Sequence, residues 1–297
     1  MASDYPEQMN ELIALTETFS GFGLVVGPAV GAGLYVLAGY EGVFLGLGIV
    51  FFAGAILIHS LLHSDKPYII AEAESHSLLN LALKYPILVN CLPVTFSMVA
   101  IGFCDTVMGP HFETFSLTPL EVGFLWALAD TGYLAVSLVL AKTLDYVNLR
   151  SVNLAGIGLV AIAYWMLGPW DVVLPRMLGL VVVGLGLVSL AIAAHYIAAL
   201  PNLIQVAEEE LHFTKDDLLI DALSALVASS TFLGEVLGPV FAGYLADLYG
   251  VELSGGIFGI VETGIGLIYL LYFLQYWRKK DTFEIRKLEE GLLLTST

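Results

Sequence analysis

Eight long apolar segments constrain this chain more than any other feature of its sequence. Each contains 18 to 27 residues, and together they cover residues 18–40, 43–63, 87–110, 122–141, 152–169, 176–200, 220–246 and 254–277. A helix of about 20 apolar residues crosses a bilayer, because a helix satisfies its own backbone hydrogen bonds in a solvent without water. The sequence therefore predicts an all-α transmembrane protein with eight spanning helices.

The composition excludes other classes of protein. Of the 297 residues, 58% are hydrophobic and 13% are charged, whereas a soluble domain contains about 25% charged residues. The net charge of −17 argues against a nucleic-acid-binding protein, which needs a basic face to neutralise phosphates. We expect the lipid bilayer as the surroundings of this chain and no nucleic acid as a partner.

The basic residues predict the orientation in the membrane. Ten of the 11 lysines and arginines lie in the connections after even-numbered segments or in the C-terminal tail, and Arg176 is the exception. Because cytoplasmic loops carry the excess of Lys and Arg, both termini are predicted to be cytoplasmic.

One internal repeat links the first and seventh segments. The first reads GLVVGPAVGAGLYVLAG (Gly23–Gly39) and the seventh reads GEVLGPVFAGYLADLYG (Gly234–Gly250). Both contain Gly-x-x-x-Gly-Pro, then small residues, then a closing glycine. Two equivalent helices six segments apart imply a six-helix repeating unit, and two such units need four more helices than this chain contains.

The segment Glu17–Gly33, ETFSGFGLVVGPAVGAG, resembles the antiporter motif in the fifth helix of the major facilitator superfamily. The closest resemblance is to the vesicular amine transporter branch, including polyamine transporters. Further matches are Gly102-Phe103-Cys104-Asp105, Ala199-Leu200-Pro201-Asn202 and the second Gly238-Pro239. The sequence departs from the motif at Ala32, with Gly33 one place late, and only Asp145 and Arg150 remain of a second family signature.

The resemblance implies a partial major facilitator fold whose eight helices correspond to family helices 5–12. Residues 1–63 are then a two-span remnant of the N-terminal lobe, and residues 64–86 are the cytoplasmic inter-lobe loop. Residues 87–277 form the six-helix C-terminal lobe and residues 278–297 a cytoplasmic tail. The missing N-terminal helices are a candidate partner.

Four carboxylates inside the apolar segments are the candidate substrate- and proton-binding residues: Asp105, Asp130, Glu235 and Glu262. A charged side chain costs about 2.5–3.5 kcal/mol at the centre of a spanning helix, so these acids are expected to face a cavity or a partner. A carboxylate that exchanges a proton for a cation supplies the chemistry of a proton:cation antiporter. The alternative for Asp130 and Glu235 is a hydrogen bond between packed helices. For Glu262 it is packing against a neighbouring helix, and for Asp105 it is a solvated helix end.

The antiporter motif contributes Gly23, Gly27, Pro28 and Gly31. Glycines four residues apart allow two helix backbones to approach closely, and Pro28 bends the helix. The resemblance implies that this bent seam also seals the two lobes against proton leak. Glu17, which opens the motif, is interpreted as a solvated acid at the cytoplasmic margin.

Histidines and the tail complete the candidate residues. His195 is interpreted as a packed neutral histidine bonded to a carbonyl, with a proton relay as the alternative. His59 and His63 lack a third ligand, so no metal site and no cofactor is expected. The tail sequence Glu289–Leu294 resembles an acidic dileucine sorting signal, which implies a sorting adaptor and a vesicular or endolysosomal membrane rather than the plasma membrane.

These observations favour a transporter over an enzyme. The sequence shows no paired-aspartate, Ser–His or zinc pattern of an intramembrane enzyme. The leading hypothesis is proton-coupled antiport of a small organic cation, an amine or polyamine, by alternating access. The alternative is a truncated non-transporting isoform or a gene-model fragment of such a transporter.

Overall fold

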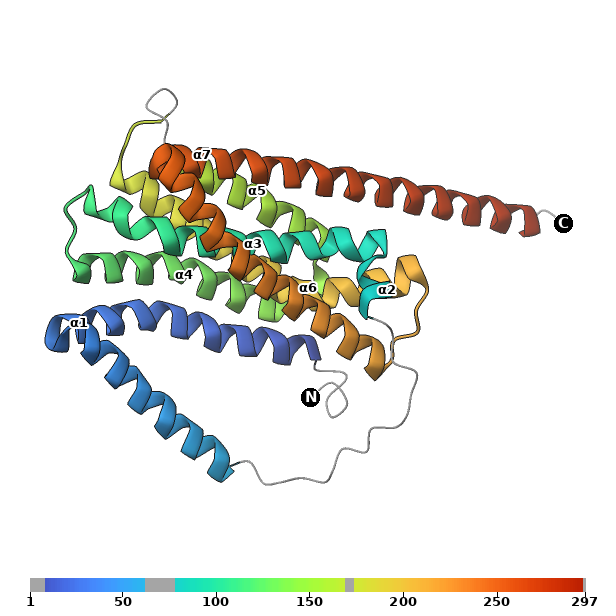
Figure 1. Cartoon of the computed structure of the whole chain (residues 1–297). Helices are drawn as coiled ribbons and strands as arrows, with labels where there is room; N and C mark the ends of the chain where they lie inside the picture. Colours follow the sequence, from blue (N-terminus) through green and yellow to red (C-terminus); the bar gives the residue numbers. More distant parts are fainter. Residues whose placement is uncertain (1–8, 62–77, 169–173, 296–297) are drawn as a thin grey trace.

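The computed structural model describes residues 9–61, 78–168 and 174–295, and within these ranges the chain is helical without a β-strand (Figure 1). The helices are α1 (Met9–Leu61), α2 (Leu78–Ala82), α3 (Tyr85–Glu113), α4 (Pro119–Thr143), α5 (Leu149–Leu167), α6 (Leu178–Leu211) and α7 (Asp217–Thr295), and a 3₁₀ turn (Leu144–Tyr146) follows α4. Most of the predicted inter-lobe loop and His63 lie outside the described residues.

The two longest helices each reverse direction at one glycine. Gly39 has φ 67° and ψ −169° inside α1, and Gly250 has φ 78° and ψ 164° inside α7. This combination is essentially restricted to glycine, because a Cβ atom would clash with the backbone. α1 therefore has a first arm (9–38) and a second arm (40–61), and α7 has a first arm (217–249) and a second arm (251–295). The two reversals are the closing glycines of the sequence repeat.

The arms and helices correspond segment by segment to the apolar stretches of the sequence. Six helices in the described part of the chain are long and apolar enough to cross a membrane, with α1 and α7 each counted once. The arms of α1 and α7 supply four apolar segments, and α3 to α6 supply the other four. The all-α transmembrane class is confirmed, whereas the number of crossings and the orientation stay predictions.

Local sequence sets where the helices of the bundle begin. Thr118 caps α4 by accepting a hydrogen bond from the backbone of Glu121, and the Glu121 carboxylate accepts from the Thr118 backbone in return. Asn148 caps α5 through the backbone N–H of Ser151. Such caps satisfy N–H groups that the first turn of a helix leaves without partners.

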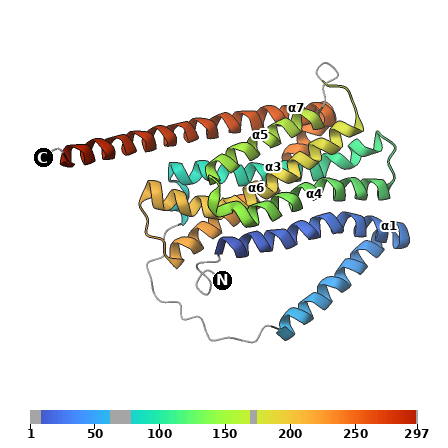
Figure 2. The same cartoon turned by 180° about the vertical axis from the view of Figure 1, so that it is seen from behind.

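Helices α3 to α7 form a bundle, and the first arm of α1 lies along α4 on its outside (Figures 1 and 2). An aromatic cluster in the bundle core joins three helices: the ring centroid of Phe258 lies 5.1 Å from that of Phe103 and 4.4 Å from that of Tyr164. The second arm of α1 leads away from the bundle and exposes Phe44, Ile49 and Phe52. Apolar side chains of this kind suit lipid contact.

Arg150 ties three helices together at one end of the bundle. Its side chain is 1% exposed and donates to Glu209 at 3.0 Å and to Glu210 at 3.1 Å. The guanidinium also lies 3.8 Å from the ring centroid of Tyr276. The beginning of α5, the end of α6 and the second arm of α7 are thus joined by one buried cation.

Three glycines of the first Gly-Pro motif have no close neighbour in the described part of the chain. A Cβ atom added at Gly23, Gly27 or Gly31 would meet no atom within 4 Å. The reason is that α1 contacts α4 through another face, where Gly21 lies against Tyr133 and where Gly123 of α4 lies against Pro28. No described helix lies against these three glycines, so the closely packed glycine seam stays a prediction.

Candidate functional site

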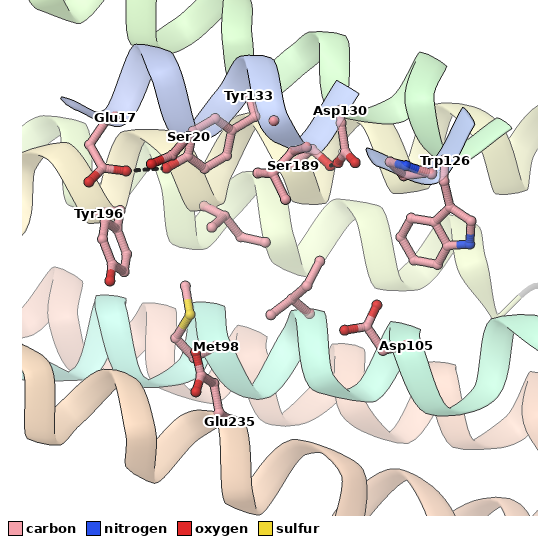
Figure 3. Close-up of a pocket in the computed structure, with 15 residues that line it drawn as sticks. Glu17, Ser20, Met98, Asp105, Trp126, Asp130, Tyr133, Ser189, Tyr196 and Glu235 are labelled. Atoms are coloured by element: carbon pink, nitrogen blue, oxygen red, sulfur yellow. Dashed lines mark hydrogen bonds between the residues drawn. The ribbon is translucent and has the colours of Figure 1, made fainter. Parts of the chain in front are cut away.

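A cavity of about 740 Å³ lies between α1, α3, α4, α6 and the first arm of α7 (Figure 3). Three of the four predicted acids line it, namely Asp105, Asp130 and Glu235. Gly23 and Pro28 of the antiporter motif also line it, whereas Gly27 and Gly31 are not among its lining residues. The fold thus brings together residues that are up to about 200 positions apart in the sequence.

Asp130 is the most buried acid of the cavity. It is 6% exposed, and the Ser189 hydroxyl on α6 donates a hydrogen bond of 2.8 Å to its Oδ1 atom. A buried carboxylate needs such a donor to offset part of the solvation it has lost. Because Ser189 takes one oxygen, the second oxygen of Asp130 is left to bind a proton or a cation from the cavity.

Asp105 and Glu235 line the same side of the cavity, across from Glu17 and Asp130 (Figure 3). Asp105 is on α3, Glu235 is on the first arm of α7, and both are classed as exposed. Figure 3 shows Asp105 near Trp126 at one end of the cavity and Glu235 near Met98 toward the other end. The helix-packing alternative for Glu235 is not what the structure shows, since this carboxylate borders open space.

Glu17 lines the same cavity, although the sequence interpretation placed it at a solvated margin. It is half-buried, and Tyr133 of α4 donates a hydrogen bond of 2.5 Å to its Oε2 atom. The signal that could have found it is its position one turn before Gly21, on the side of α1 that contacts α4. Figure 3 shows this pair beside Tyr196 at the end of the cavity opposite Asp105.

Glu262 is set apart from the other three predicted acids. It is 1% exposed on the second arm of α7 and is not among the residues that line the cavity. Its helix face packs on α5, where Gly266 lies against Ile157 and Gly259 lies against Trp165. The structure therefore places Glu262 within the packed lobe, in the interhelical position that was its alternative.

His195 adopts the packed arrangement expected for it. Its Nε2 atom lies 2.9 Å from the backbone oxygen of Asn153, and its Nδ1 atom is hydrogen-bonded to the Ser97 hydroxyl. A carbonyl oxygen can only accept, so Nε2 carries the proton and Nδ1 accepts from Ser97. His195 joins α3, α5 and α6 as a neutral ring, and it does not line the cavity.

The cavity has the electrostatics of a cation site. None of its described lining residues is a lysine, an arginine or a histidine, while four are carboxylates. Trp126, Tyr133 and Tyr196 add aromatic faces, which attract cations through their ring quadrupoles. Metal binding has no comparable support, because the described residues contain no group of three potential ligands close together.

Comparisons with known proteins identify the family. The sequence profile of the Major Facilitator Superfamily matches residues 3–212, which is well over half of the chain. The chain is 28% identical over 286 residues to the MFS-type transporter SLC18B1 of Homo sapiens, covering 94% of this chain and 61% of that protein. The protein of the same name from Rattus norvegicus is 25% identical over 92% of this chain, and the alignment covers 60% of its length.

The chain thus spans about three fifths of the length of these relatives, and their name agrees with the expectation of a transporter rather than an enzyme. The profile match also covers the helices that carry Glu17, Asp105 and Asp130, so the cavity is built largely from the matched region. This multi-pass membrane protein belongs to the Major Facilitator Superfamily.

Proposed function

We propose that this protein contributes to proton-coupled antiport of small organic cations, amines or polyamines, by alternating access. The observation that carries the proposal is the meeting of Asp105, Asp130 and Glu235 with Glu17 in one cavity without a basic lining residue. The relatives are named MFS-type transporters, which supports transport in general. The coupling and the substrate class rest on the cavity and on the resemblance of the Gly-Pro segment.

The proposed mechanism is competition for a carboxylate. Asp130 exchanges a proton for an ammonium group, because each species neutralises the same buried charge and the two cannot bind together. Asp105 and Glu235 add negative charge to the same cavity, which favours entry of a cation. If each species loads from a different side of the membrane, the exchange becomes antiport.

The test uses proteoliposomes that contain the purified chain and an acidic interior. We expect uptake of a radiolabelled amine that stops when an ionophore collapses the pH gradient. Asp130→Asn should reduce uptake at least about tenfold, because the variant cannot exchange a proton for a charge. Asp247→Asn is the matched control, since Asp247 is an exposed acid of α7 outside the cavity. The proposal would be contradicted if amine uptake did not depend on the pH gradient, or if Asp130→Asn and Asp247→Asn changed uptake equally.

One observation favours a second candidate, a non-transporting protein that binds helices of other membrane chains. The glycine face of α1 has no neighbour within the described residues, and the most apolar window of α1 contains no buried residue. The same proteoliposomes separate the candidates: this second role predicts no amine uptake by the chain alone and recovery of a partner after crosslinking from Gly27→Cys.

The proposed location is a vesicular or endolysosomal membrane, on the strength of the Leu-Leu sequence near the end of α7. Replacing Leu292 and Leu293 with alanine should move the protein to the cell surface, as measured by surface biotinylation. An unchanged distribution would remove the support for this location.

A further inference from the structure

Glu17 lies at the end of the cavity that is farthest from Asp105, and this separation is informative (Figure 3). We propose that Glu17, oriented by Tyr133, is a specificity-determining residue that anchors the second positive charge of a two-ended cation. The inference rests on the proposed cation binding and deepens it, because it assigns a role to a residue that the antiport mechanism above does not require.

Tyr133 fixes the direction of Glu17. The tyrosine side chain is 5% exposed, and its hydroxyl donates to Glu17 Oε2 at 2.5 Å. The ring can lie this close to α1 because residue 21 is glycine: a Cβ atom there would come within 2.8 Å of the Tyr133 Cδ1 atom. Because Oε2 accepts the hydrogen bond from Tyr133, we assign the second oxygen, Oε1, to the contact with a cation in the cavity.

Glu17 is not the only acid at this end. Glu235 approaches from α7, and Tyr196 of α6 lines the same cavity, beside Glu17 in Figure 3. Glu17, Tyr133, Tyr196 and Glu235 come from α1, α4, α6 and α7, so four different helices supply this end of the cavity. A positive charge placed there meets two carboxylates and two tyrosines, so the end of the cavity is a subsite of its own.

The two ends are separated by a length that one ammonium group does not span. Glu235 follows Gly234, which packs on Met98 of α3, and Asp105 lies seven residues beyond Met98. Seven residues correspond to about 10 Å along a helix. Between the ends, Ile101 of α3 and Ile192 of α6 present apolar side chains to the cavity. Acids at both ends and an apolar middle match an alkyl chain with an ammonium group at each end.

The experiment compares an extended alkyl diamine with the alkyl monoamine of the same length. Binding of each to the purified full chain in detergent is measured by isothermal titration calorimetry. Wild type is expected to bind the diamine more tightly. Glu17→Gln should weaken diamine binding about tenfold, the effect of losing one charge-assisted contact, and should leave monoamine binding unchanged.

Three further variants separate an anchoring role from a structural one. Glu17→Asp keeps the charge and should retain part of the diamine preference. Tyr133→Phe should reduce the preference less than Glu17→Gln, because it removes the orienting bond but leaves the carboxylate. Glu41→Gln, an exposed acid on the same helix and outside the cavity, should change neither affinity.

The proposal is overturned if wild type shows no preference for the diamine, or if Glu17→Gln weakens both amines equally or neither. These outcomes are distinct from failure of the proposed antiport. A diamine preference that depends on Glu17, combined with proteoliposome uptake that ignores the pH gradient, would support the anchor and contradict the antiport.

Discussion

The first arms of α1 and α7 carry the same Gly-Pro motif in two different surroundings. In α7 the motif is packed: a Cβ atom at Gly238 would come within 2.7 Å of the Val99 oxygen of α3, and Gly102 of α3 lies against Pro239. In α1 a Cβ atom at Gly27 would meet no atom within 4 Å. Both arms nevertheless end in the same backbone reversal, at Gly39 and Gly250.

The comparison separates two properties that the motif combines. The closing glycine acts locally, because its backbone angles exclude other residues wherever the arm lies. The small-residue face acts only when a second helix lies against it, as α3 does for α7. No described helix lies against the Gly23, Gly27 and Gly31 face of α1. The same motif therefore forms a packed interface in α7 and an open face in α1.

The largest expected effect comes from filling the packed glycine. Gly238→Leu should lower the free energy of unfolding by about 3 kcal/mol, because α3 and α7 would have to move apart. Gly27→Leu should leave it unchanged or raise it by up to about 1 kcal/mol, since leucine favours the helix and meets no neighbour. Unfolding by SDS in mixed micelles measures both. Equal losses would show that the α1 face is packed.

The two reversals should respond alike. Gly39→Ala and Gly250→Ala are each expected to lower the free energy of unfolding by about 1–2 kcal/mol, because alanine cannot adopt these backbone angles without strain. Gly243→Ala, in open space on the same arm of α7, is the matched control and should not destabilise. If Gly39→Ala and Gly250→Ala lowered the free energy of unfolding by very different amounts, the two repeats would not be equivalent at their reversals.

A smaller effect is expected where α1 is attached to α4. Tyr133→Phe removes the hydrogen bond to Glu17 and should lower the free energy of unfolding by about 1 kcal/mol. Tyr244→Phe is the control, since Tyr244 is 65% exposed on α7. The same SDS titration measures both variants. If Tyr133→Phe and Tyr244→Phe have the same free energy of unfolding, the hydrogen bond from Tyr133 to Glu17 does not stabilise the packing of α1 on α4.

Much of the fold follows from periodicity and composition alone. The eight apolar segments reappear as helices or arms, and the glycines that close the repeat reappear as reversals. The packing of α1 could not be predicted from the sequence. A face of small residues permits a second helix to pack closely, but it does not show whether such a helix is present. Gly23 and Gly31 have the right spacing and still border open space.

The site was predictable in part for a related reason. The cost of charge in lipid selects Asp105, Asp130 and Glu235, and they do meet in one cavity. The same cost also selects Glu262, which lies buried between helices away from the cavity, because hydropathy alone does not say which acids share a cavity. Glu17 was missed because its partner, Tyr133, is 116 positions away in the sequence.

The reversals at Gly39 and Gly250 also govern how the chain enters a membrane. A turn of one residue is too short to cross the hydrocarbon core, so the two arms of α1 must insert as a pair, and so must those of α7. If each arm crosses the bilayer, as the sequence predicts, the free ends of each pair share one side of it. A charged segment at either free end, such as Arg278 and Lys279 beyond α7's apolar stretch, sets the topology of both arms at once.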